Sequence, residues 1–154
     1  HYPLRRQRQM CIRDRDYLDA LNIDLIVLAG YMKILTNPFT QRFAGKILNI
    51  HPSLLPKYPG IHTYQRALEN GDSEHGTTVH FVNEEIDAGA IVLQAKVPIF
   101  PGDTVEEIEL RTREQEYNIY PLVIKWFIED RLKLIENQAY LDGKLLPPNG
   151  YAYE

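Results

Sequence analysis

The sequence predicts an α/β fold in which helices flank a mostly parallel sheet. Two nearly continuous apolar runs, Ile23–Gly30 and Ile47–His51, are typical of strands buried on both faces of a parallel sheet. Between them, Asn37–Phe43 predicts a short helix, because Asn37 can cap it and Pro38 suits the first helical position. The order strand, helix, strand therefore indicates a right-handed crossover.

The rest of the chain continues this pattern with further strands and helices. Thr77–Val82 alternates and is rich in β-branched residues, and Ala90–Pro98 follows it after an Asp87–Gly89 turn, which together predict a hairpin-like strand pair. A capping box at Thr104–Glu107 opens a long helix that Pro121 is able to kink. The apolar positions of this helix include Ile108, Leu110, Tyr117, Ile119 and Tyr120. The remaining expected elements are helices at Asp16–Asn22 and His62–Glu69, the second ended by Asn70 and Gly71, and a terminal hairpin at Arg131–Glu136 and Ala139–Leu141.

Composition places the chain among ordinary globular proteins. Its 154 residues suit one core, and 44% apolar and 25% charged residues are typical of a soluble domain in the cytoplasm. No apolar stretch approaches the roughly 20 residues that cross a bilayer, and no secretory signal is evident. The single cysteine, Cys11, excludes an internal disulfide framework, and the scattered histidines do not predict a metal site.

The first 15 residues differ from the remainder in charge. They hold five of the 17 basic residues and one of the 21 acidic residues. We interpret 1–15 as a non-native or disordered arm that precedes a domain at 16–154. An RNA-binding role would rest on these arginines alone, because no aromatic residues interleave them and no nucleic-acid module follows.

The segment that ends the second apolar run carries candidate chemistry. Asn49 and His51 stand two positions apart, so in a strand they point to the same face, and Pro52 keeps His51 extended. An amide donor beside an imidazole can polarise a carbonyl group and hold its oxyanion. The alternative is a turn whose hydrogen bonds are satisfied locally. The prolines and the glycine of 52–60 favour a rigid loop at a strand end, where functional residues concentrate.

Other candidate residues have a structural reading beside the functional one. Asp87 is either an ordinary turn residue or a carboxylate that faces His51 and favours its charged form. His80 lies within a strand pattern and is equally compatible with packing and with a site. We expect solvent exposure for two histidines and one glutamate in polar stretches, His62, His75 and Glu74, and for the mid-helix carboxylate of Glu116. The run Met32–Leu35 fits either an apolar pocket wall or core packing.

Several motifs together resemble the glycinamide ribonucleotide formyltransferases, a folate-dependent family of purine synthesis. The resemblance runs from Asp16 to the C-terminus. The segments that carry it are Leu28–Leu35, Asn49–Gly60, His75–Val82, Glu85–Gly89 and Leu145–Tyr151. The combination of Asn49, His51 and Asp87 is shared by a wider group that includes methionyl-tRNA formyltransferase and formyltetrahydrofolate hydrolase. The resemblance implies a Rossmann-like, formyltransferase-type sheet.

The resemblance also implies a reaction and roles for individual residues. The amine of glycinamide ribonucleotide would attack the formyl carbon of 10-formyltetrahydrofolate, without metal. Asn49 and protonated His51 would stabilise the oxyanion, and Asp87 would keep His51 charged. The folate would contact Met32, Lys33, Ile34, Leu35, Asn83, Glu84, Glu85, Ile86 and Asp87. The ribonucleotide would contact Gly30, Asn49, Ile50 and Glu116, with Thr78 and His80 bordering the site. The partners implied are small molecules, without nucleic acid or membrane, for a monomer or homodimer.

The sequence departs from this family at its N-terminus. No glycine-rich phosphate-binding turn occurs before Asp24, and the family's first strands have no counterpart. We therefore interpret 16–154 as about the C-terminal two thirds of the family domain, and we expect this chain to be poorly soluble and nearly inactive. A related formyltransferase, a formyltetrahydrofolate hydrolase and a non-catalytic folate binder stay open as alternatives.

Overall fold

The computed structural model describes residues 21–30, 37–85 and 87–151. The expected arm at 1–15 and nearly all of the helix expected at Asp16–Asn22 lie outside these residues. The described elements, in chain order, are β1 (Ile26–Ala29), α2 (Asn37–Arg42), β2 (Ile47–His51), α3 (Thr63–Glu69), β3 (Glu74–Phe81), β4 (Ile91–Pro98), α4 (Val105–Ile128), β5 (Leu132–Ile135), β6 (Gln138–Leu141) and β7 (Lys144–Leu145).

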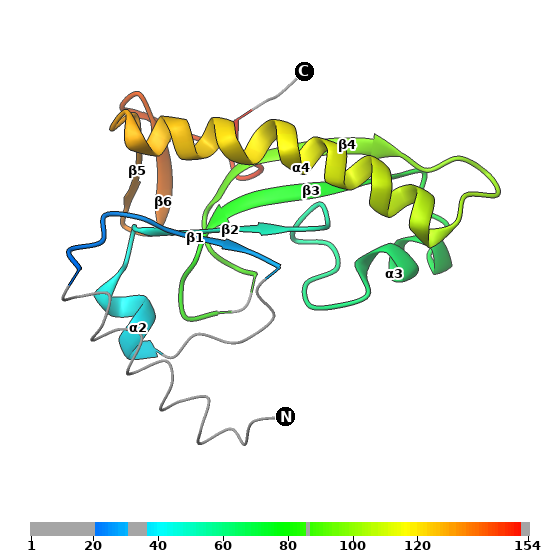
Figure 1. Ribbon diagram of the computed structural model, residues 1–154, viewed down its shortest axis with the longest axis horizontal. Helices are drawn as coiled ribbons and strands as arrows, with labels where there is room; N and C mark the ends of the chain where they lie inside the picture. The colour runs from blue at the N-terminus through cyan, green and yellow to red at the C-terminus, as the bar shows by residue number, and fades with distance from the viewer. Residues whose placement is uncertain (1–20, 31–36, 86, 152–154) are drawn as a thin grey trace.

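Strands β1 to β4 form one sheet in that order, covered on one side by α4 (Figure 1). β1 and β2 pair in parallel, and α2 connects them in the sequence, which confirms the predicted order of strand, helix and strand. β2 and β3, and then β3 and β4, pair antiparallel. The α/β class is confirmed. Within the described strands, however, β1–β2 is the only parallel pairing in this sheet. β3 and β4 form the hairpin that the Asp87–Gly89 turn predicted.

The long helix α4 supplies much of the core. Thr104 caps it by accepting a hydrogen bond from the backbone N–H of Glu107 at 3.2 Å, as the capping box predicted, and the helix continues past Pro121 to Ile128. Two of its expected apolar positions face solvent instead: Leu110 and Tyr117 are exposed. The core between α4 and the sheet contains Leu48, Val79, Phe81, Leu93, Ile119, Tyr120, Val123 and Trp126.

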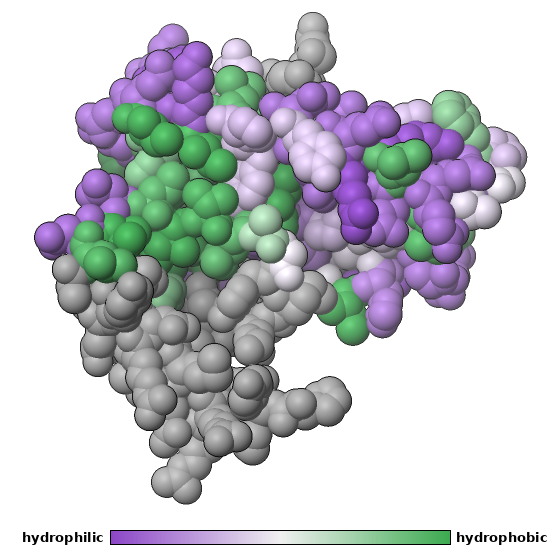
Figure 2. All heavy atoms as spheres, in the orientation of Figure 1, coloured by the Kyte–Doolittle hydropathy of each residue, from purple (hydrophilic) through white to green (hydrophobic). Residues whose placement is uncertain are grey.

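β1 is less buried than its sequence predicts. The run Ile23–Gly30 suggested burial on both faces, but the side chains of β1 alternate between partial burial and exposure, and Val27 is 42% exposed. The reason is the position of β1 at the edge of the described sheet, where β2 is its only neighbouring strand among the described residues. Figure 2 accordingly shows apolar surface gathered on the side of the molecule where β1 lies, whereas the surface over the N-terminal half of α4 is largely hydrophilic.

The C-terminal part forms a separate three-stranded sheet. β5 and β6 make the predicted hairpin, and β7 pairs with β6. Among the described residues, no helix combines the length and apolarity needed to cross a membrane. The fold thus places the ends of β1 and β2, the β2–α3 loop (residues 52–62) and the β3–β4 connection on one side of the main sheet (Figure 1).

Candidate active site

A cavity of about 830 Å³ opens at the C-terminal ends of β1 and β2. Its volume lies within the range of small-molecule sites, roughly 300–1,000 Å³. The walls come from the β1 end, β2, the β2–α3 loop with the start of α3, the β3–β4 connection and α4. The residues that line it are Leu28, Ala29, Gly30, Asn49, Ile50, His51, Pro52, Gly60, Ile61, His62, Thr63, Tyr64, His80, Val82, Asn83, Glu84, Glu85, Asp87, Glu109, Arg113 and Glu116.

Asn49 occupies the middle of β2, directly opposite His80 of β3. Its amide nitrogen Nδ2 lies 3.5 Å from Nε2 of His80. The amide oxygen Oδ1 is buried and has no hydrogen-bond partner among the described residues. An unpartnered buried acceptor is uncommon in native proteins and often marks a position that a ligand completes. Asn49 therefore offers hydrogen-bonding capacity that the described chain does not use.

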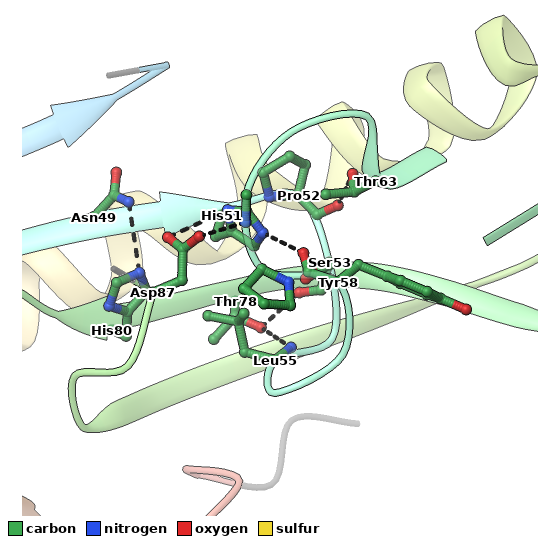
Figure 3. A network of polar contacts seen from close by, with 12 residues as sticks. Asn49, His51, Pro52, Ser53, Leu55, Tyr58, Thr63, Thr78, His80 and Asp87 are labelled. Carbon is green, nitrogen blue, oxygen red and sulfur yellow. Dashed lines mark hydrogen bonds and ion pairs between the residues drawn. The ribbon is translucent and has the colours of Figure 1, made fainter. Parts of the chain in front are cut away.

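His51 ends β2 and lies between two acceptors (Figure 3). Its Nε2 donates to the carbonyl oxygen of Tyr58 at 2.8 Å, and its Nδ1 lies 3.5 Å from Oδ1 of Asp87. The Tyr58 carbonyl carries no hydrogen, so Nε2 of His51 carries one and donates it. The ring and the carboxylate are both largely shielded from water, which strengthens their attraction.

Asp87 reaches His51 from the β3–β4 connection. Its backbone has φ of +52°, a left-handed turn conformation that aspartate tolerates better than most residues. The second carboxylate oxygen, Oδ2, accepts a hydrogen bond from the backbone N–H of Gly60 at 2.8 Å. The two sequence readings of Asp87 thus both describe the structure, because it is a turn residue and also the neighbour of His51.

The β2–α3 loop is fastened from beneath by a polar network (Figure 3). Thr78 of β3 donates to the carbonyl oxygen of Ser53 at 2.7 Å and accepts from the backbone N–H of Leu55 at 3.1 Å. Thr78 is fully buried below the loop and does not line the cavity, where the resemblance placed it at the border. Its hydroxyl group contacts the loop and Nε2 of Gln94 in β4 instead.

His75 was expected to be exposed, but it is 1% exposed. Its Nε2 donates to the carbonyl oxygen of Pro52 at 2.7 Å, and its ring lies 5.3 Å from the ring of Tyr64. Burial lowers the pKa of the His75 imidazole. These contacts come from the β2–α3 loop and from α3, which are distant from His75 in the sequence, so its polar neighbours along the chain did not reveal them. Exposure was predicted correctly for Glu74 and His62.

The α4 wall of the cavity is charged. Glu116, expected to face solvent, is half-buried, and its Oε1 accepts a hydrogen bond from Thr77 at 3.4 Å. Burial raises the pKa of the Glu116 carboxyl group. Glu109 and Arg113 line the same wall and were not singled out in the sequence. Glu109 and Arg113 are four residues apart, and Arg113 and Glu116 are three apart, so all three lie on one face of the helix. This spacing was the sequence signal that could have placed them on one wall.

The remaining predicted residues fall into two groups. Gly30, Ile50, Asn83, Glu84 and Glu85 line the cavity, and Asn83 shapes the connection by accepting the backbone N–H of Glu85 at 2.9 Å. Met32, Lys33, Ile34, Leu35 and Ile86 lie outside the described residues. In the part of the chain that the structure describes, no cluster of three or more His, Cys, Asp or Glu side chains could hold a metal ion.

Comparison with known proteins identifies the family of this site. The model of a family described as formyl transferase matches residues 1–124. The chain belongs to the formyl transferase family. The resemblance drawn from the sequence motifs is thereby confirmed.

Three similar proteins of the formyl transferase family carry the same name. Phosphoribosylglycinamide formyltransferase of Haemophilus influenzae is 78% identical over 139 residues, which are 90% of this chain and 66% of that protein. The Escherichia coli protein of the same name is 57% identical over 142 residues, 90% of this chain and 67% of that protein. The chain thus spans about two thirds of the length of these relatives. A solved phosphoribosylglycinamide formyltransferase from Coxiella burnetii superimposes with a TM-score of 0.91 at 42% identity, covering 99% of this chain and 71% of that one.

Proposed function

We propose that this chain carries the formyl-transfer site of a phosphoribosylglycinamide formyltransferase. In the proposed reaction, 10-formyltetrahydrofolate gives its formyl group to the amine of glycinamide ribonucleotide during purine synthesis. One observation supports this most directly: Asn49, His51 and Asp87 meet at one cavity, with His51 and Asp87 3.5 Å apart. The similarity to relatives with that activity supports the choice of substrates.

The chemistry begins with attack of the amine lone pair on the formyl carbon. The electrons of the carbonyl π bond move to oxygen, so the tetrahedral species carries an oxyanion. The Nδ2 hydrogens of Asn49 and an N–H of His51 are the donors available to it, and fixed donors of this kind commonly supply a large share of rate enhancement. At Nε2 of His51 the oxyanion competes with the carbonyl oxygen of Tyr58.

The second half of the reaction moves protons. Collapse of the tetrahedral species re-forms the carbonyl group and breaks the bond to N10 of the folate, which leaves with the bonding electron pair and takes up a proton. The attacking amine loses one proton in the same exchange. Asp87 lies beside Nδ1 of His51 and orients the ring to carry a proton in this exchange, and the Gly60 N–H holds the carboxylate in place.

The cavity has room and polarity for two substrates. The wall formed by Glu116 and Arg113 offers a carboxylate and a guanidinium group, which suit the hydroxyl and phosphate groups of a ribonucleotide. The connection 83–85 lies near Asp87 on the opposite side and is the expected folate wall. A hydrolase of formyl folate needs only water as acceptor, so the charged second wall favours transfer over hydrolysis.

A single-turnover experiment tests this function. Purified protein in excess over isotopically labelled 10-formyltetrahydrofolate is mixed with and without glycinamide ribonucleotide, and the label is followed into formyl-ribonucleotide or formate. We expect label in the ribonucleotide only when the amine is present. Excess protein makes the chemical step visible even when turnover is slow. Equal formate release with and without the amine would instead indicate a hydrolase.

Two substitutions at asparagines separate the site from the scaffold. Asn49→Leu removes the amide at similar size and should lower the single-turnover rate by about 10²–10³-fold. Asn118→Leu makes the same change at an exposed position of α4 and should leave the rate unchanged. Undiminished binding of a folate analogue without formyl transfer, at stoichiometric protein, would favour a non-catalytic folate binder.

We further infer a cytoplasmic enzyme that acts on small molecules as a monomer or homodimer, without metal, nucleic acid or membrane. The acidic composition outside residues 1–15 supports the expectation that nucleic acid is not a partner. Light scattering after size-exclusion chromatography measures the oligomeric state, and a trimer or larger closed assembly would contradict the inference. Loss of formyl transfer on treatment with a chelator, restored by a metal, would contradict the metal-free mechanism.

A further inference from the structure

The contact between Asn49 and His80 joins a proposed donor to a side chain without an assigned role. The two residues face each other across β2 and β3, with Asn49 Nδ2 and His80 Nε2 3.5 Å apart. His80 is 2% exposed, yet it borders the cavity. Figure 3 shows the amide nitrogen of Asn49 turned toward His80 and the amide oxygen turned away from it.

The second nitrogen of His80 determines which tautomer the ring adopts. Nδ1 lies 2.8 Å from the carbonyl oxygen of Phe81, which has no hydrogen to donate. Nδ1 must therefore carry a hydrogen and donate it. Burial lowers the pKa of the His80 imidazole, so the ring is neutral near neutral pH. A neutral ring with its hydrogen on Nδ1 presents a lone pair at Nε2.

That lone pair distinguishes the two orientations of the Asn49 carboxamide. The orientations have nearly the same shape, so packing alone does not select between them. With Nδ2 toward His80, an N–H meets the lone pair; with Oδ1 toward His80, two acceptors face each other. The observed orientation leaves the second N–H of Nδ2 for the oxyanion and leaves Oδ1 buried without a partner.

We propose that His80 is a positioning residue that fixes the Asn49 carboxamide with its donor group available to the reacting formyl oxygen. This inference rests on the proposed formyl transfer, because only that reaction gives the orientation of Asn49 a consequence. His80 itself acts through Asn49 and through no contact with the reacting atoms. The Oδ1 atom, unpartnered among the described residues, is then the cost of this orientation.

Two substitutions separate positioning from simple packing. In His80→Gln, an amide oxygen can occupy the place of Nε2 and accept from Asn49, but the donor to Phe81 is lost. In His80→Asn, the shorter amide can still donate to the Phe81 carbonyl, but nothing accepts from Asn49. We expect His80→Asn to lower kcat by roughly 10- to 100-fold with little change in KM, and His80→Gln to stay closer to the unmodified protein.

A purely structural His80 predicts the opposite order. In that case the variant that keeps the bond to Phe81, His80→Asn, would retain more activity than His80→Gln, and the proposal would be overturned. Thermal unfolding of both variants checks that each is folded at the assay temperature. The same single-turnover assay serves here, so slow overall turnover does not mask the comparison.

A measurement without turnover keeps the proposal testable. Long-range ¹H–¹⁵N NMR of the unmodified protein reports which His80 nitrogen carries the hydrogen, and a nuclear Overhauser effect connects the Asn49 amide hydrogens to the His80 ring. We expect the hydrogen on Nδ1 and the Overhauser effect present. A hydrogen on Nε2 overturns the proposal. If formyl transfer itself is absent while both NMR results hold, the proposed function fails and the observed orientation stands.

Discussion

Removing the hydroxyl group of Thr78 should destabilise the protein far more than its size suggests. Thr78 is fully buried, and its hydroxyl donates to the Ser53 carbonyl and accepts from the Leu55 N–H at 3.1 Å and from Nε2 of Gln94 at 3.0 Å. Thr78→Val keeps the shape but deletes all three hydrogen bonds. Gln94 retains a partner, because it also donates to the Leu55 carbonyl at 2.8 Å.

The expected cost follows from the groups left behind. The Ser53 carbonyl and the Leu55 N–H each lose this partner in a buried setting, and each such loss costs about 1–3 kcal/mol. The free energy of unfolding should therefore fall by roughly 2–6 kcal/mol, a large part of the 5–15 kcal/mol typical of a domain. Urea unfolding followed by the fluorescence of the single tryptophan, Trp126, measures it.

Thr112→Val is the matched control. Thr112 is also fully buried, and its hydroxyl donates at 2.8 Å to the carbonyl of Ile108, one turn earlier in α4. That carbonyl already accepts the backbone N–H of the helix ladder, so the substitution leaves no orphaned group. We expect a change within about 1 kcal/mol. Equal losses in the two variants would refute the reasoning, because the cost would then belong to the hydroxyl and not to its abandoned partners.

Three further predictions concern pH and packing. Burial lowers the pKa of His75 and His80 below the 6.5 of a solvent-exposed imidazole, so the unfolded chain binds more protons than the folded chain. The urea concentration at the unfolding midpoint should therefore fall as the pH is lowered from about 7.5 to about 5.5. The raised pKa of Glu116 acts in the opposite direction, and a midpoint that rises as the pH is lowered would show that Glu116 dominates. Tyr120→Phe deletes a hydroxyl that lies 2.6 Å and 3.0 Å from carbonyls of β1 and β2, and should cost about 1 kcal/mol and speed amide hydrogen exchange in β1. Gly89→Ala would place a Cβ 1.7 Å from the last β3 carbonyl oxygen, so it should lower the thermal midpoint, whereas an unchanged midpoint would contradict that contact.

Local patterns located the elements well and their surroundings less well. The run Ile47–His51, the strand after Ala90 and the capped helix after Thr104 coincide closely with β2, β4 and α4, because periodicity and capping are properties of neighbouring residues. The exposure of Val27 depended on which strands and helices cover β1. An apolar run reports hydrophobicity, and it carries no information about what lies against it.

In the candidate site, too, local relations could be predicted from the sequence and long-range contacts could not. Asn49 and His51 were paired by the strand repeat of two, which is local. The approach of Asp87 to His51 required the chain to return through β3 and the following connection, so the residues alone left it open. The contact from Tyr58 was beyond sequence reasoning, because it uses a backbone carbonyl that every residue possesses.

The β2–α3 loop links the stability of the fold to the geometry of the site. It places the Tyr58 carbonyl on His51 and the Gly60 N–H on Asp87, so each member of the His51–Asp87 pair has one hydrogen bond from the loop. The loop in turn is fastened by Thr78 from below. A change at Thr78 should therefore slow formyl transfer although it touches neither side chain, because the ring and the carboxylate would lose the contacts that orient them. The same dependence explains why a rigid, proline-rich sequence follows β2: a loose loop would leave the ring of His51 free to turn away from the Asp87 carboxylate.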